Sequence, residues 1–276
     1  PIIFPLPYSK FFTFLNKIIL VNKLKRWMKI CYFDDPIFIT FLPTPLIHQL
    51  FDNFVSPFII YYCANHMAEG STESKPLRKW EDRMFKRANL VFSISDLITR
   101  RASKFTNKVF FIPPGVDLDK FIISNDKNLI PKDIINIKKP ILGYVGTIGS
   151  VIDIKTIKFI ASNLENCSIV LVGPIYTKIS ELLSLSNVFI LGEKKHEIIS
   201  SYIKRFDVAL IPYIKNDFTD NVYSCKINEY LSLGKPVVSS NTNEIEIFNK
   251  NNENIIEIAS SPEEYVNKIL SSLKFN

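Results

Sequence analysis

The chain has 276 residues, of which 47% are hydrophobic and 22% charged, so it can form about two globular domains and is too apolar to be disordered. Its net charge of +7 favours anionic partners such as nucleotides or an acidic membrane surface, although a genome biased towards lysine explains it equally well. No run reaches the ~18 uncharged apolar residues of a membrane span. The four cysteines form no CxxC pair, so a zinc site is not expected and a reducing cytoplasm is the default location.

The first half of the chain predicts an incomplete parallel α/β domain. A long basic helix is expected over Lys10–Ile30, and few strands follow it. The strand candidates are Ile2–Pro5, Pro36–Phe41, Phe58–Tyr62, Leu90–Ser93 and Val109–Ile112, with helices expected at Arg78–Arg87 and Asp96–Phe105. Because the chain starts at Pro1 and strands are few, we expect the true N-terminus and the opening strand to be missing.

The helix Lys10–Ile30 combines lysines and an arginine with phenylalanines and a tryptophan. Basic and aromatic residues on one helix are typical of contact with an anionic membrane surface. The alternative, slightly favoured, is a helix that packs on the core and turns its lysines to solvent. Nucleic-acid binding is not expected, because the sequence carries no zinc-finger, helix-turn-helix or RNA-binding signature.

The second half alternates short apolar runs with helical patterns, which is typical of βαβ units and of a doubly wound, Rossmann-like sheet. Strands are expected at Ile141–Gly146, Ser168–Val172, Asn187–Leu191, Asp207–Ile211, Pro236–Ser239 and Ile255–Ile258, and helices at Ile154–Leu164, Lys178–Leu185, Glu197–Lys204, Lys226–Leu233, Ile245–Asn249 and Pro262–Leu273. The polar stretch Phe121–Lys139 predicts a linker, so we expect domains at 1–125 and 126–276.

Glycines follow three of these strands. Gly146 with Thr147, Gly173 and Gly192 lie where strands end, and the carboxyl ends of parallel strands line the ligand crevice. Each glycine alone is more simply an ordinary turn, but several at one edge favour a site that a ligand approaches closely. Tyr213 follows the strand Asp207–Ile211 and is expected to border the same crevice.

The segment Tyr223–Ser240 is the most informative stretch of the sequence. Lys226 and Glu229 stand three residues apart at the start of an expected helix, and therefore on one helical face. A helix N-terminus attracts phosphate, so Lys226 could contact a diphosphate and Glu229 a ribose diol. The alternative interpretation is a weak surface salt bridge between the two. In the first half, His66 follows a strand end and is a candidate catalytic residue that would contact donor or acceptor, although a structural or merely exposed histidine is the more common interpretation.

Together these residues resemble the GT-B glycosyltransferases of the group-4 kind, especially the branch that acts in bacterial cell-surface polysaccharide synthesis. The resemblance covers most of the chain, and its most specific part is Lys226–Val238. The other matching segments are Ile141–Gly146 with Asp153, Leu171–Pro174, Asn187–Gly192, Asp207–Tyr213, Tyr61–Cys63, Glu81, Ala88–Ser93, Ser95, Leu97, Ile112–Asp117 and Phe121.

The resemblance implies an α/β fold with two Rossmann-like domains that face each other across a cleft. It implies that Glu229 holds the nucleotide ribose and that Lys226 and the helix start Ser224–Ile227, with Cys225, hold the diphosphate. The turn at Gly146 and Thr147 would face sugar and phosphates, and the base would lie near Gly173 and Gly192. Such enzymes are usually retaining and need neither a metal nor a further cofactor.

This sequence departs from the family pattern at the diphosphate. The stretch Thr147–Asp153 lacks the basic pair of many relatives, and Glu229 stands without a second glutamate before the helix. Asn65 replaces the family aspartate of the first domain.

These features favour an enzyme that transfers a sugar from a nucleoside diphosphate sugar to a glycan or a lipid-linked acceptor. Such an enzyme would be cytoplasmic, at the inner face of the membrane if the basic helix binds lipid. One alternative is a catalytically inactive GT-B subunit that binds or assembles a polysaccharide complex. The other, ranked lower, is a non-hydrolysing sugar-nucleotide epimerase, which would need several carboxylates that we cannot assign.

Overall fold

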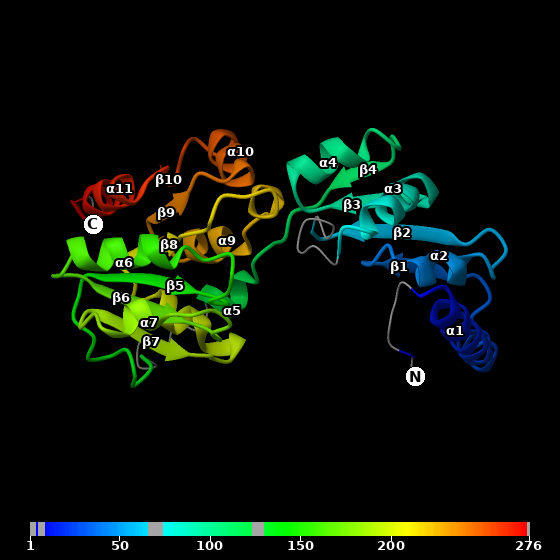
Figure 1. Cartoon of the computed structure of the whole chain (residues 1–276), viewed down its shortest axis with the longest axis horizontal. Coiled ribbons are helices and arrows are strands. Elements are labelled where there is room, and N and C mark those ends of the chain that lie inside the picture. The colour runs from blue at the N-terminus through cyan, green and yellow to red at the C-terminus, as the bar shows by residue number, and fades with distance from the viewer. Residues whose placement is uncertain (1–3, 5–8, 66–73, 123–129, 275–276) are drawn as a thin grey trace. The chain divides into compact units, whose positions relative to one another are not determined.

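A computed structural model describes residues 4, 9–65, 74–122 and 130–274. The chain divides into two compact units, Pro1–Pro113 and Pro114–Asn276, each built on its own parallel sheet (Figure 1). In the described part of the chain, no helix has the length and apolar character needed to cross a bilayer. The candidate His66 lies outside the described residues. The predicted strand Ile2–Pro5 does so as well, apart from Phe4.

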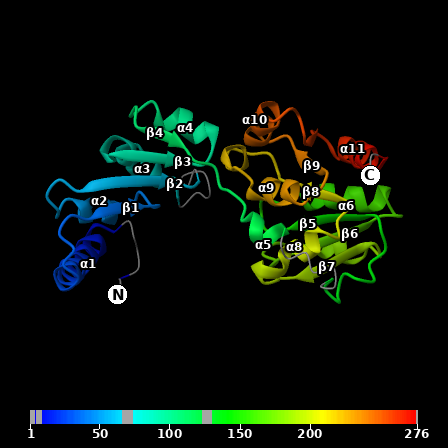
Figure 2. The ribbon, with the colours of Figure 1, turned by 180° about the vertical axis from the view of Figure 1, so that it is seen from behind.

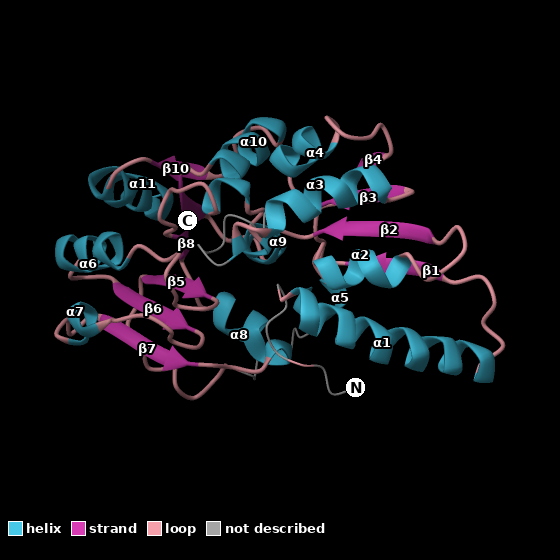
Figure 3. Ribbon diagram, turned by 45° about the vertical axis from the view of Figure 1, so that its right-hand side comes forward, coloured by secondary structure: helices cyan, strands magenta, loops and turns pink. Residues whose placement is uncertain are grey.

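Unit 1 has a four-stranded parallel sheet in the order β1-β2-β3-β4. Its strands are β1 (Ile37–Thr40), β2 (Phe58–Cys63), β3 (Leu90–Ser93) and β4 (Val109–Phe111), and its helices are α1 (Lys10–Ile30), α2 (Pro45–Phe51), α3 (Leu77–Arg87) and α4 (Asp96–Ala102). Each strand joins the sheet beside the strand before it, so right-handed crossovers bring the connecting helices to one face. Figure 3 shows α2 and α3 packed along one side of this sheet.

Burial in unit 1 therefore alternates along the strands. In β2, Ile59, Tyr61 and Cys63 are buried under the helices, whereas Phe58 on the other face is exposed. The register places Phe58 beside Ile37, so the open face continues onto β1, where Ile37 and Ile39 are exposed. The described strands of unit 1 thus form a sheet with one covered face and one open apolar face.

Unit 2 has a six-stranded parallel sheet in the order β10-β9-β8-β5-β6-β7, which is doubly wound about β5 as predicted. Its strands are β5 (Ile141–Val145), β6 (Ser168–Val172), β7 (Val188–Gly192), β8 (Val208–Ile211), β9 (Val237–Ser240) and β10 (Glu257–Ala259). Its α-helices are α5 (Leu118–Ile122), α6 (Ile154–Asn163), α7 (Ser180–Leu183), α8 (Ile199–Ile203), α9 (Cys225–Ser232), α10 (Asn243–Asn251) and α11 (Pro262–Lys274).

Helices cover both faces of the second sheet. α6 and α7 lie in front of it in Figure 1, and α8 and α9 lie in front of it in Figure 2. Every residue of β5, β6 and β8 is buried, which is the pattern of central strands in a doubly covered parallel sheet. The continuous apolar runs that predicted these strands are therefore explained by burial on both faces.

The division between the units lies earlier than the predicted boundary after residue 125. The expected linker Phe121–Lys139 instead contributes Phe121, Ile134 and Ile137 to the core of unit 2. Phe121 belongs to α5, a short helix that was not predicted and that packs against α8 and α9. The segment was predicted to be a linker because its average composition is polar. Single apolar residues within such a segment can still be buried in a core.

Candidate functional site

The carboxyl ends of β5, β6 and β7 meet at one edge of the second sheet, and a glycine stands at or just after each end. The Gly146 amide donates to the Val172 carbonyl at 2.8 Å, and the Gly173 amide donates to the Gly192 carbonyl at 2.9 Å. Gly146 and Gly173 have φ values of +138° and +148°, which side chains rarely tolerate. A Cβ atom on Gly173 would lie 2.0 Å from the Gly146 oxygen, so the backbones of these turns touch.

Lys226 extends from α9 over this glycine edge. A Cβ atom on Gly146 would lie 2.4 Å from Lys226 Cε, so glycine at this position leaves the space that the lysine fills. The ammonium lies 5.6 Å from the ring centroid of Tyr144 and 5.9 Å from that of Tyr213. Two aromatic rings thus hold a cation above the turn without neutralising it.

The tyrosine rings are themselves fixed by hydrogen bonds. The Tyr144 hydroxyl donates to the Thr147 carbonyl at 3.0 Å, across the glycine turn. The Tyr213 hydroxyl lies 3.4 Å from the Ser224 hydroxyl, and both residues are buried. The Tyr230 hydroxyl accepts a hydrogen bond from the Val145 amide at 2.9 Å, which connects α9 to the end of β5. The lysine therefore rests on a rigid support.

The first turn of α9 faces the same edge. Ser224 is the N-cap residue, yet its side chain makes no capping hydrogen bond and contacts Tyr213 instead. The helix begins at Cys225, one residue before the predicted start, and Cys225 is exposed at its tip. The unshielded amino end adds the positive end of a helix dipole to the charge of Lys226.

Glu229 lies one turn further along α9 and is half-buried. Burial raises the pKa of this carboxyl group, while the nearby charges of Lys226 and His196 act in the opposite direction. Lys226 and Glu229 are both in the described part of the chain, and they form no ion pair with each other there. The surface salt bridge that the sequence left open is therefore not formed, and both groups remain available to a ligand.

A cavity of about 330 Å³ collects these groups, and all of its walls belong to unit 2. The predicted Gly146, Thr147, Gly173, Cys225, Lys226 and Glu229 line it, together with Val145, Val172, Pro174, Glu193, Lys194, His196 and Ile199. Cavities of this size are typical of small-molecule sites. In the described residues, no three His, Cys, Asp or Glu side chains gather to hold a metal ion.

Four predicted residues lie beside or behind the cavity. Gly192 ends β7 one residue before the lining Glu193, while Tyr213 and Ser224 support Lys226 from behind. Ile227 does not face the cavity, because its side chain is buried in the core. Its amide donates to the Ser224 carbonyl at 3.1 Å, so the main chain of Ile227 is engaged as well.

The segment after β7 supplies residues that the sequence analysis missed. Lys194 and His196 line the cavity, and neither was predicted. Lys194 pairs with Asp133 at 2.8 Å, and the Tyr202 hydroxyl donates to the same carboxylate at 2.9 Å. Burial tends to raise the pKa of the Asp133 carboxyl group, but the hydrogen bonds from Lys194 and Tyr202 outweigh burial, so this pKa is lowered. No local pattern in the sequence marked Lys194 and His196, because their position after Gly192 shows only that the segment starts at this edge of the sheet.

Comparison with known proteins agrees with this geometry. Residues 139–274 match the family described as Glycosyl transferases group 1. TuaH of Bacillus subtilis (strain 168), named as a teichuronic acid biosynthesis glycosyltransferase, is 29% identical over 176 residues, which is 60% of this chain and 44% of TuaH. The chain thus spans less than half the length of that relative.

Solved structures share the fold. A glycosyltransferase from Rickettsia africae ESF-5 matches with a TM-score of 0.74 at 15% identity, covering 99% of this chain and 74% of that one. Anabaena Alr3699/HepE in complex with UDP matches with a TM-score of 0.60 at 16% identity, covering 79% and 63%. The two α/β units therefore have the fold of GT-B glycosyltransferases, and the second unit matches the family model of the group 1 glycosyl transferases.

Proposed function

We propose that this protein transfers a sugar from a nucleoside diphosphate sugar to a glycan or lipid-linked acceptor in the synthesis of a cell-surface polysaccharide. The observation that carries the proposal is the pair on α9. Lys226 is held over two positive-φ glycine turns by Tyr144 and Tyr213, and Glu229 lies unpaired in the same cavity. A bare cation at a helix start suits a diphosphate, and a carboxylate one turn away suits a ribose diol.

In this proposal the diphosphate binds Lys226 and the first turn of α9, beside Thr147. The ribose hydroxyls donate to Glu229, and the base lies towards Gly173 and Gly192. As the bond from the sugar to the diphosphate breaks, negative charge grows on the leaving group, and Lys226 stabilises it. No general base is assigned, because in a retaining reaction the departing phosphate can accept the proton of the acceptor. No metal or further cofactor is proposed.

The names of similar proteins support both the proposed donor and the proposed polysaccharide product. Structures of Alr3699/HepE are described with UDP and with UDP and glucose, which favours a nucleotide donor. TuaH is named for teichuronic acid biosynthesis, which favours an anionic surface polysaccharide. A cytoplasmic location, with peripheral contact of the helix Lys10–Ile30 at the inner membrane face, completes the proposal. No role is assigned to His66.

The donor site is tested by a thermal-shift panel of UDP, GDP, ADP, CMP and dTDP. A nucleotide at about 100 times its dissociation constant should add roughly 2.7 kcal/mol to the free energy of unfolding. We expect one nucleotide to raise the melting temperature of the parent protein and to lose most of that effect in Glu229→Ala. Radiolabelled donor with a membrane extract as acceptor source then measures transfer.

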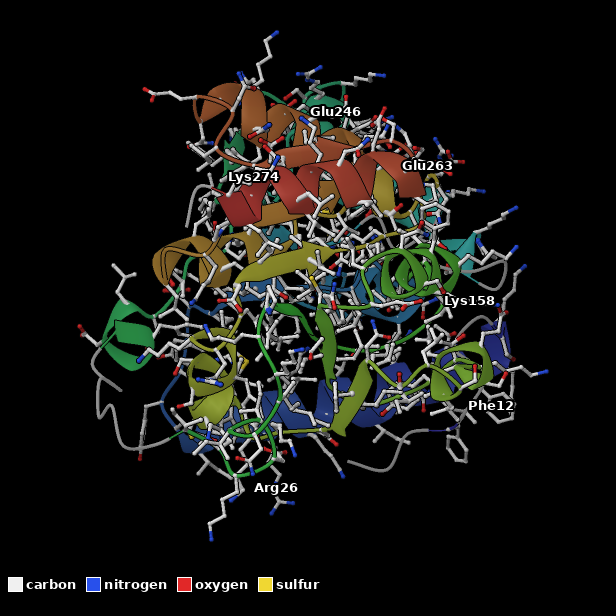
Figure 4. All side chains as sticks on the ribbon, turned by 90° about the vertical axis from the view of Figure 1, so that its left-hand side faces the viewer. Phe12, Arg26, Lys158, Glu246, Glu263 and Lys274 are labelled. Atoms are coloured by element: carbon white, nitrogen blue, oxygen red, sulfur yellow. The ribbon has the colours of Figure 1, made fainter. Side chains whose placement is uncertain are left out.

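Glu246→Ala is the matched control, because Glu246 is an exposed glutamate on the neighbouring helix α10 (Figure 4). It should retain the full nucleotide shift. An equal loss in both variants, or an undiminished shift in Glu229→Ala, would remove the assigned role of Glu229. Binding without transfer or donor hydrolysis would instead favour a non-catalytic subunit.

A further inference from the structure

A second cavity, of about 920 Å³, lies in unit 1 at the amino ends of β1 and β2. Its walls are the last turns of α1, the segment 31–36 that leads into β1, and the segment 52–57 that leads into β2. We call these three segments the amino-end rim. The donor-site cavity belongs entirely to unit 2, so the rim is a separate surface.

Apolar side chains stand at the tips of the rim. Val55 is 99% exposed and Tyr32 is 91% exposed, and they lie on the two segments that flank the cavity. Trp27 and Ile30 at the end of α1 are also exposed. Fully exposed apolar groups on neighbouring tips bury nothing within this chain, and such patches mark surfaces that contact a partner.

The backbone at both tips is held in an uncommon conformation. Tyr32 has a φ of +50°, and Ser56, next to Val55, has a φ of +44°. Non-glycine residues in this region cost free energy, and they occur more often at functional sites than elsewhere. The turns keep Tyr32 and Val55 outside the core, although Phe54 beside Val55 packs inward against Phe38 at 4.9 Å between ring centroids.

Positive charge surrounds these tips. Lys23, Lys25, Arg26 and Lys29 are exposed along the last two turns of α1, and Lys25 and Lys29 line the cavity. Figure 4 shows Arg26 projecting outward from this helix. The rim also carries three exposed carboxylates, Asp34, Asp35 and Asp52, the last of which pairs with Arg87, so four cations face three anions on it. Lys25 lies 5.7 Å from the Phe54 ring, which brings the charge next to the apolar wall.

We propose that the amino-end rim is a docking surface for an anionic lipid bilayer. Val55, Tyr32, Trp27 and Ile30 would enter the boundary between headgroups and acyl chains, and the four cations would face lipid phosphates. The proposal deepens the peripheral membrane contact proposed above and moves its centre from the whole helix to this rim. Docking there leaves the carboxyl ends of the same strands uncovered, where ligands of parallel sheets bind.

Vesicle co-sedimentation tests the proposal. Vesicles of phosphatidylcholine alone and of phosphatidylcholine with phosphatidylglycerol are mixed with the protein at low and high salt. We expect binding to the anionic vesicles, weaker binding to neutral ones, and a decrease with salt. Tyr32→Asn with Val55→Ser should abolish most binding at all salt concentrations. Lys25→Gln with Lys29→Gln should lower the partition coefficient on the order of tenfold at low salt.

Matched variants separate docking from general effects of charge and apolarity. Lys155→Gln with Lys250→Gln removes two exposed lysines of unit 2, and Leu183→Ser removes an exposed leucine of α7. Both controls should bind like the parent protein. Failure of the parent to bind anionic vesicles, or equal losses in rim and control variants, would overturn the proposal. Retention of binding in the Tyr32 and Val55 variant would overturn it as well.

Two exposed cysteines make the membrane test independent of the donor test. Cys31 lies on the rim and Cys225 lies on the donor cavity, while Cys63 and Cys167 are buried. Anionic vesicles should slow alkylation of Cys31 and leave Cys225 unchanged, and the bound nucleotide should do the reverse. Protection of Cys225 alone would support the donor site while rejecting the rim, and protection of Cys31 alone would do the opposite.

Discussion

The two units build their parallel sheets from similar strands but cover them differently. In unit 2, β5, β6 and β8 are buried along their whole length, and helices pack on both faces. In unit 1, burial alternates, and Ile37, Ile39 and Phe58 are exposed on the face away from the helices. Parallel sheets are normally covered on both sides, so the open face is the exceptional feature.

The covered side of unit 1 also has a different chemistry. Its core contains a buried carboxylate, Glu81, which pairs with Arg101 and accepts a hydrogen bond from Tyr61 at 3.0 Å. Burial, with the nearby carboxylate, raises the pKa of both Tyr61 and Cys63, so both stay protonated as donors. The core of unit 2 consists mainly of isoleucine, leucine and valine side chains. The apolar core of unit 1 thus encloses an ion pair, which makes that pair a test of how unit 1 is stabilised.

The largest effect that tests this comparison is expected at the buried ion pair. Arg101→Met removes the partner of Glu81 and leaves a buried carboxylate without its counter-charge. We expect the free energy of unfolding of unit 1 to fall by about 3–5 kcal/mol. Both tryptophans of the chain, Trp27 and Trp80, belong to unit 1, so urea unfolding followed by tryptophan fluorescence reports on this unit.

The neighbouring residue supplies the control for Arg101. Arg100 pairs with Asp96 on the exposed side of α4, so Arg100→Met should cost only about 0.5 kcal/mol. Equal losses from the two arginines would show that burial of the pair is not what stabilises unit 1.

A smaller effect is expected from one change made on each sheet. Val170→Thr places a hydroxyl group in the fully buried strand β6 and should cost about 1–3 kcal/mol. Ile39→Thr, on the open face of β1 where the side chain is 60% exposed, should change stability by less than about 0.5 kcal/mol. Calorimetry of the two variants measures both values. A comparable loss at Ile39 would mean that the open face is covered in the folded protein.

The sequence predicted most of the fold because unit 2 follows simple rules. β6 has the predicted bounds Ser168–Val172, since an apolar run there ends at Gly173. The helix α2 was not predicted, because Pro43 and Pro45 lie at its start and proline commonly interrupts regular structure. Thr44 instead caps the helix by accepting the Ile47 amide, and Pro45 occupies its first turn, where proline is favoured.

The candidate site was predictable only where its residues carry local signals. Lys226 and Glu229 share one helical face at a helix start, and glycines mark the strand ends. Lys194 and His196 have no such signal, because their place in the cavity depends on how far the segment after β7 turns back over the sheet edge. The same reasoning explains Ile227, whose position in α9 was predicted while the direction of its side chain was not.

A further modest stability effect concerns Glu229, where binding and stability should oppose each other. Burial raises the pKa of this carboxyl group, so the folded protein holds its proton to a higher pH than the unfolded chain does. The resulting stabilisation is complete below the unfolded pKa and is lost as pH rises through the folded pKa. The glutamine side chain in Glu229→Gln is neutral at every pH, so the stability of this variant should not fall as pH rises through that pKa. Without nucleotide, the variant should therefore melt higher than the parent by no more than about 2–4 °C at neutral pH.

The same variant should bind the donor nucleotide more weakly. An amide offers one acceptor where the carboxylate offers two charged oxygens, so affinity should fall roughly ten- to a hundredfold. Melting curves between acidic and neutral pH, with and without nucleotide, measure both quantities in one experiment, with Glu246→Gln as the control. A variant that binds nucleotide as well as the parent, or that is less stable without it, would contradict the view that the fold keeps a costly carboxylate in unit 2 for its ligand.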